Sequence, residues 1–160
     1  MSEPDTCVAA IDPGLEGAVA FLFPAVPDRV SVEDMPTVEG AVDVTELQRL
    51  LRQYGPVAVA VERVGPMPRD GSKQAFGFGA AYSAAKATVQ LSGYPLHLFT
   101  PQTWKRHHRI LGAEDPKEAA RGLALRLFPG STEAFRLKRH HGRADAALLA
   151  AYTAAVLSGA

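Results

Sequence analysis

The sequence predicts an α/β protein with a mixed five-stranded sheet flanked by helices. Short apolar runs come first as a series of strands, and strands then alternate with helical patterns, which is typical of this class. The 160 residues are 47% hydrophobic and 21% charged, enough to bury one substantial core. Since no internal repeat or linker-like stretch interrupts them, we expect a single domain over residues 1–160.

Three short strands are predicted at the start of the chain. The apolar runs at residues 7–11 and 18–23 are separated by the turn signal Asp12-Pro13-Gly14, which predicts a β-hairpin. Residues 29–35 alternate weakly between apolar and polar side chains and predict a third strand. We expect these first three strands to be antiparallel.

A helix and a buried strand follow this meander. Apolar residues recur with helical spacing between residues 44 and 51, Asp43 is placed to cap that helix, and Gly55-Pro56 ends it. Residues 57–61 form a continuous apolar run, VAVAV, of the kind that is buried on both faces in a parallel sheet. Glu62 ends this fourth strand.

The second half of the chain predicts a long loop, one more strand and several helices. Residues 65–79 contain four Gly and two Pro, too many for a regular element, and a helical stretch follows. Residues 93–99 predict a fifth strand, parallel to the fourth. The helices are expected at residues 80–91, 101–107, 117–128 and 144–157.

Three acidic residues each lie at the edge of an apolar element: Asp12, Glu62 and Asp145. A carboxylate moved out of water costs several kcal/mol unless a cation or hydrogen-bond donors compensate its charge. A divalent metal ion is the simplest such partner. The spacing therefore suggests one metal-binding carboxylate cluster.

The net charge of zero hides an asymmetry along the chain. Residues 1–104 hold five more acidic than basic residues, and residues 105–160 hold five more basic than acidic ones. Most of the excess cations lie in WKRHHR and RLKRHHGR, at residues 104–109 and 136–143. This is the pattern expected where a polyanion lies across the surface, although a solvated face is the alternative interpretation.

The remaining composition excludes several protein classes. The single cysteine, Cys7, rules out an internal disulfide framework and indicates a reducing environment. The first residues lack the features of a signal peptide, and the most apolar stretch, AALLAAYTAAVL, is too short to span a membrane. We therefore expect a cytoplasmic protein with no membrane partner, and the sequence leaves a phage-encoded or organellar origin open.

A series of motifs then resembles the RuvC family of Holliday-junction resolvases, in particular the compact forms of phages and organelles. In chain order they are IDPGLEGAVAF with VEDMP, VAVAVERVGPMP, SKQAFGFG, TPQTWK and HHGRADAALLAAY. The resemblance spans nearly the entire chain. It implies an RNase H-like fold and a homodimer that resolves four-way DNA junctions by paired symmetric nicks, in DNA recombination and repair. The implied products are 5′-phosphate and 3′-hydroxyl ends.

The resemblance also implies the catalytic residues. Asp12, Glu62 and Asp145 match the family's metal-binding carboxylates. Bacterial members have an acid or His three residues before the last Asp, where this chain has Gly142. His141, four residues before Asp145, lies on the same helical face if the helix starts early enough, so we predict it as a metal ligand or near-site acid or base. An exposed or phosphate-contacting His is the alternative.

The expected chemistry is metal-dependent hydrolysis with two Mg²⁺ or Mn²⁺ ions per active site. Two such ions can generate hydroxide from water, orient it in line with the scissile phosphorus and stabilise the leaving 3′ oxygen. An imidazole among the ligands favours Mn²⁺. Lys105 resembles a family lysine that approaches the scissile phosphate, and we count it as catalytic and DNA-binding.

DNA recognition is expected in the Gly-rich segment and in the basic third of the chain. Phe76 and Phe78 alternate with glycines, which suits stacking on an unpaired base, although both could instead pack the start of the next helix. Further phosphate contacts are predicted for Arg69, Lys73, Lys138, Arg139 and Arg143.

Other functions remain open. An actin-like nucleotide-binding protein would use the DPG turn for phosphates but needs two domains, so we expect no nucleotide cofactor. Another RNase H-like nuclease, acting on RNA or flaps, would share the acids, and a non-catalytic junction-binding protein would share the fold. The Ala-rich helix beginning at Ala80 would allow close packing inside the fold or across a two-fold dimer interface.

Overall fold

The structure is a computed structural model that describes residues 5–65 and 69–159. Its centre is a five-stranded sheet in the order β3-β2-β1-β6-β7. The strands are β1 (Val8–Asp12), β2 (Ala18–Leu22), β3 (Ser31–Asp34), β6 (Val59–Glu62) and β7 (Leu96–Phe99). β1, β2 and β3 pair antiparallel, whereas β6 runs parallel to β1 and to β7. The predicted mixed sheet is confirmed.

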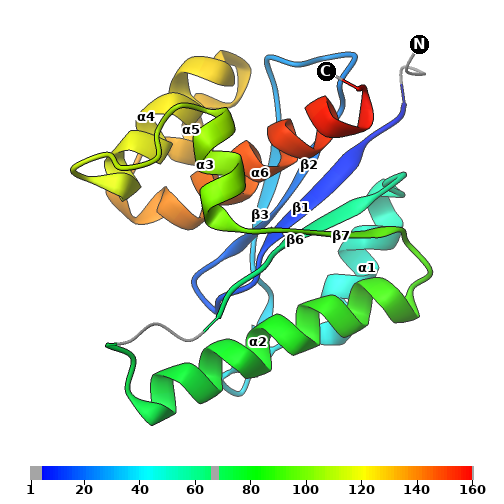
Figure 1. Cartoon of the computed structure of the whole chain (residues 1–160). Helices are drawn as coiled ribbons and strands as arrows, with labels where there is room; N and C mark the ends of the chain where they lie inside the picture. The colour runs from blue at the N-terminus through cyan, green and yellow to red at the C-terminus, as the bar shows by residue number, and fades with distance from the viewer. Residues whose placement is uncertain (1–4, 66–68, 160) are drawn as a thin grey trace.

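Helices cover both faces of this sheet (Figure 1). One face carries α1 (Val44–Tyr54) and α2 (Ser72–Leu91). The other carries α3 (Pro101–His107), α4 (Pro116–Leu127), α5 (Thr132–Phe135) and α6 (His141–Leu157), with short 3₁₀ turns at Pro129–Ser131 and Lys138–His140. In the described ranges, no helix has the length and apolar character needed to cross a membrane.

A small hairpin, β4 (Thr37–Val38) and β5 (Ala41–Val42), was not predicted from the sequence. Its turn places Glu39 and Gly40 at φ values of 50° and 77°. A left-handed pair of this kind matches the twist of a tight hairpin, which explains the glycine. The hairpin leads directly to Asp43, whose side chain accepts a hydrogen bond from the Glu46 N–H at 3.1 Å and caps α1 as predicted.

The alternation of side chains along β1 builds two separate cores. Val8 and Ala10 pack on the face covered by α6, with Ala60 of β6 beside them. Ala9 and Ile11 pack on the opposite face, against α1 and α2. Because successive residues of a strand point to opposite faces, this pattern also fixes the direction of the residues that end the strands.

The predicted loop over residues 65–79 was wrong in its second half, and its residues 66–68 lie outside the part of the chain that the structure describes. Helix α2 begins at Ser72, so Phe76 and Phe78 lie in its first two turns. The later turns of α2 are anchored by buried Ala81, Ala85 and Val89. Since extending a helix from a packed segment costs little compared with nucleating one, the packed turns outweigh the poor helix propensity of the glycines. Helix α6 also begins earlier than predicted, at His141 and thus by three residues.

Candidate active site

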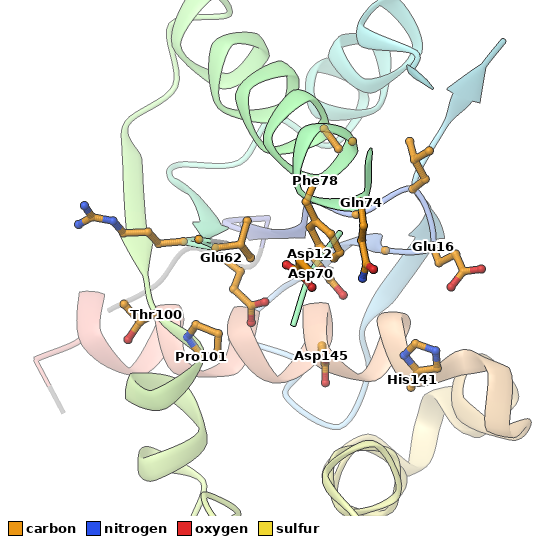
Figure 2. A pocket seen from close by; sticks show the side chains of 18 of the residues that line it. Asp12, Glu16, Glu62, Asp70, Gln74, Phe78, Thr100, Pro101, His141 and Asp145 are labelled. Carbon is orange, nitrogen blue, oxygen red and sulfur yellow. The ribbon is translucent and has the colours of Figure 1, made fainter. Parts of the chain in front are cut away.

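Asp12 and Glu62 end two neighbouring parallel strands. Ile11 of β1 pairs with Val61 of β6, so the next residue of each strand lies at the same edge of the sheet. Since Ala10 and Ala60 face α6, the alternation directs Asp12 and Glu62 to that face as well. Asp145 lies in the second turn of α6, which packs across β1 and β2. Three acids from distant parts of the sequence thus meet on one side of the sheet (Figure 2).

These acids line one cavity of about 900 Å³. His141 lines it too, one turn before Asp145 on α6 (Figure 2). The rest of the wall comes from the turn after β1, the start of α2, the β7–α3 junction and the start of α4. The side chains involved include those of Leu15, Glu16, Asp70, Gln74, Phe78, Thr100, Pro101 and Lys117.

The three carboxyl groups all resist ionisation. Burial raises the pKa of Asp12 well above its usual range, and the charges of Glu62 and Asp145 raise it further. Burial and the Glu62 charge raise the pKa of Asp145 to about 7. Burial also raises the pKa of Glu62. Each acid would therefore gain from a nearby cation, which is the electrostatic character of a metal-binding site.

Two lysines lie close enough to influence these acids. The positive charge of Lys105 opposes the rise in pKa at all three carboxyl groups. Lys117, at the start of α4, lines the cavity and acts on Asp145 in the same direction. Lys105 was predicted at this place from its motif. Lys117 was missed, because only the packing of α4 beside α6 brings it to the site.

A buried hydrogen bond links Glu62 to the neighbouring helix. The Nε1–H of Trp104 donates to Oε2 of Glu62 at 2.6 Å. Trp104 has no exposed surface and Glu62 is 8% exposed. Trp104 is therefore a core residue, and no local pattern indicated that its indole N–H reaches an acid.

The start of α6, at His141, is tightly packed. A Cβ added to Gly142 would collide with the backbone oxygen of Glu16, so α6 touches the turn after β1 at this residue. His140 is buried, and its Nδ1 accepts the N–H of Leu137 at 3.1 Å. His141 is therefore the imidazole of this pair that lines the cavity.

The predicted aromatic residues differ in position. Phe76 is 80% exposed on α2. Phe78 is 42% exposed and lies over the turn after β1, where a Cβ on Gly14 would be 3.7 Å from its ring. Phe76 thus faces outward, whereas Phe78 forms part of the cavity wall.

The predicted phosphate-binding cations lie in two regions. Arg69 and Lys73 are exposed just before and within the first turn of α2, and Lys138 and Arg139 are exposed in the turn before α6. Arg143 has a structural partner: its guanidinium donates to both carboxylate oxygens of Asp34, at 2.7 and 3.0 Å, and to the Ala134 carbonyl. It therefore ties α6 to β3.

The donor chemistry of the site fits a hard divalent cation, because its acids supply carboxylate oxygens. Among residues 5–65 and 69–159, however, no three His, Cys, Asp or Glu side chains are grouped closely enough to hold an ion as they stand. After burial, the charges of neighbouring acids also raise the pKa values of Asp12 and Asp145, so these carboxylates repel one another when ionised. A bound ion would have to draw them together.

The chain is similar to known proteins in part of its sequence and in its fold. No protein-family model matches the chain. A segment of 49 residues, 31% of the chain, is 47% identical to the chloroplastic Holliday junction resolvase MOC1 of Chlamydomonas reinhardtii; it spans only 5% of that protein's length.

Two solved structures of RuvC from Thermus thermophilus are similar over 94% of this chain and 96% of theirs, at 22% sequence identity. The TM-score is 0.61 for the complex with a Holliday junction substrate and 0.62 for the other structure. The predicted resemblance to RuvC and the RNase H-like fold are thereby confirmed.

Proposed function

We propose that this chain is a metal-dependent, structure-selective endonuclease that resolves four-way DNA junctions by paired symmetric nicks. The observation that supports it is the convergence of Asp12, Glu62 and Asp145 on one cavity in a RuvC-like fold. The acids come from β1, β6 and α6, and none of them is required by the fold, because buried carboxyl groups disfavour folding unless they have partners. A selected function explains why all three are present.

In this proposal Asp12, Glu62, Asp145 and His141 would hold two Mg²⁺ or Mn²⁺ ions. The ions would activate water for attack on phosphorus and stabilise the leaving 3′ oxygen, giving 5′-phosphate and 3′-hydroxyl ends. Lys105 and Lys117, whose charges both act on Asp145, would bind the scissile phosphate and its neighbour through their ammonium groups. The cavity wall would position the DNA strand over the acids.

The surfaces around the cavity would bind the DNA. Phe76, being the more exposed ring, would stack on an unpaired base at the crossover, and Phe78 would contact the strand inside the cavity. Arg69 and Lys73 would bind phosphates on one side, and Lys138 and Arg139 on the other. Arg143 would contact a phosphate only through the part of its guanidinium that the ion pair with Asp34 leaves accessible.

The chain would act as a homodimer, because a junction has two symmetry-related strands to cut. Helix α2 offers a surface for it. Ala80, Ser83 and Ala87 are exposed at helical spacing, and Leu91 is 86% exposed at the end of the same stripe. Small side chains allow two such helices to approach closely. Sedimentation of wild type and Ala87→Glu would test this surface, with loss of the dimer expected in the variant.

The deciding experiment is cleavage of a labelled mobile four-way junction in Mg²⁺ and in Mn²⁺, with linear duplex, RNA–DNA hybrid and flap controls. We expect paired nicks on the junction alone. Asp145→Asn should abolish cutting and leave junction binding intact, whereas Asp28→Asn, on the exposed surface, should change neither. Tight binding without cutting would instead identify a junction-binding protein, and preferential cutting of a control substrate would identify another nuclease.

A further inference from the structure

The indole of Trp104 lies between two groups of the candidate site. Its Nε1–H donates to Oε2 of Glu62 at 2.6 Å, and the Nζ of Lys105 lies 5.5 Å from the centre of its ring. The edge of the ring therefore contacts an acid, and its face attracts a cation. One side chain thus lies next to both charges.

Packing holds this indole in place. Trp104 belongs to the core between the sheet and α6, together with Ala60, Ala144 and Leu148. Helix α3 is also held in place. Thr100 caps its start, where the Thr100 and Thr103 hydroxyls are 2.8 Å apart, and after its end His108 bonds to the Leu148 carbonyl of α6 through Nε2 at 2.8 Å. In a close-packed interior the ring cannot turn away without disrupting its neighbours.

The requirements of packing alone do not explain a tryptophan at this position. A phenylalanine could also contribute an aromatic ring to the core, but it would leave Oε2 of buried Glu62 without this donor. The indole N–H donates and cannot accept, so a carboxylate is a suitable partner for it. A carboxylate accepts through both of its oxygens, and the bond to Trp104 occupies Oε2 while leaving Oε1 available to an ion.

We infer that Trp104 is a positioning residue that orients Glu62 for metal binding through its indole N–H. This inference rests on the proposed function. A ligand already held in one orientation loses less conformational freedom when an ion binds. Partners that orient a metal ligand typically contribute about 10- to 100-fold in metal affinity or activity.

The chain contains a single tryptophan, which allows a clean test. Growth of a tryptophan auxotroph on benzothienylalanine would replace the N–H of Trp104 by sulfur and keep the ring shape. The matched control is 5-fluorotryptophan, which keeps the N–H. Mn²⁺ affinity, measured by electron paramagnetic resonance, should fall about 10- to 100-fold with the sulfur analogue. It should change little with the fluorinated one, and both proteins should remain folded.

Equal Mn²⁺ affinity in the two folded proteins would overturn the inference. If the sulfur analogue fails to fold, the single indole ¹H–¹⁵N resonance of the wild type provides a second test. It should move in a saturable way during Mg²⁺ titration, and an unmoved resonance at Mg²⁺ concentrations that stabilise the protein would equally overturn the inference. A wild type that shows these Trp104 effects but leaves junctions uncut would contradict the proposed function alone.

Discussion

Asp145→Asn should stabilise the metal-free protein at neutral pH, although it removes a residue that we propose is essential for cutting. Burial and the Glu62 charge raise the pKa of Asp145 from 3.8 to about 7. The folded state therefore holds the Asp145 proton more tightly than the unfolded state does. The contribution of Asp145 to stability is therefore fully present below its unfolded pKa and is lost as pH rises from about 4 through about 7.

The size of this effect follows from the pKa difference. A rise from 3.8 to about 7 corresponds to roughly three pKa units, each equivalent to about 1.4 kcal/mol. Ionised Asp145 would then lower the free energy of unfolding by up to about 4 kcal/mol. Because Asp145 lines an open cavity and is not fully buried, we expect about 2–4 kcal/mol for the stabilisation by asparagine above pH 8. Near pH 4 the two proteins should differ little.

Urea unfolding in EDTA at a series of pH values measures this difference directly. Asp34→Asn is the matched control, because its hydrogen bond with Arg143 lowers the pKa of Asp34. That variant should be less stable than the wild type at neutral pH, with the difference lost as pH falls through the lowered pKa. Added Mn²⁺ should stabilise the wild type more than Asp145→Asn. If Asp145→Asn is less stable than the wild type at pH 8 without metal, the electrostatic reasoning is wrong.

Three further predictions concern packing and DNA contacts. In a thermal unfolding assay, Gly142→Ala should lower the free energy of unfolding by about 1–3 kcal/mol, because its Cβ would collide with the Glu16 carbonyl. The control is Gly122→Ala within α4, which has room for a methyl group and should be neutral or stabilising by up to about 1 kcal/mol. Phe76→Ala should leave the unfolding temperature unchanged, since the ring is 80% exposed. The same variant should weaken junction binding by about 1–3 kcal/mol in a fluorescence anisotropy titration. An unchanged affinity would argue against stacking. Arg139→Ala should reduce the slope of log K against log salt by about 0.9, and an unchanged slope would show that this side chain binds no phosphate.

The strands and the acids were predictable because both follow from local patterns. Apolar runs ending in Asp12 and Glu62 identify strands, and the period of two along a strand then gives the face that each acid occupies. The sequence also indicated Asp145 through the resemblance of its motif. What local patterns could not supply was the distance between these acids, because it depends on how α6 crosses the sheet.

The errors lay where tertiary contacts outweigh local propensity. The glycines of the SKQAFGFG segment predicted a loop, yet α2 continues through them because its later turns are packed. Among residues 5–65 and 69–159, nothing lies within 4 Å of a Cβ added to Gly77 or Gly79, so packing within this part of the chain does not require glycine there. Lys117 and the N–H of Trp104 were missed for a related reason, since each reaches the site across a packing interface.

The first turn of α6 explains how the site departs from the bacterial pattern. Gly142 stands three residues before Asp145, and backbone contact with Glu16 leaves no space for a side chain there. The same contact holds α6 close to the turn that follows β1, and Asp12 and Asp145 line one cavity beside it. A side chain at position 142 would push α6 away from this turn. We therefore propose that His141, one full turn from Asp145 and lining the same cavity, takes the fourth position because close packing has excluded the usual one.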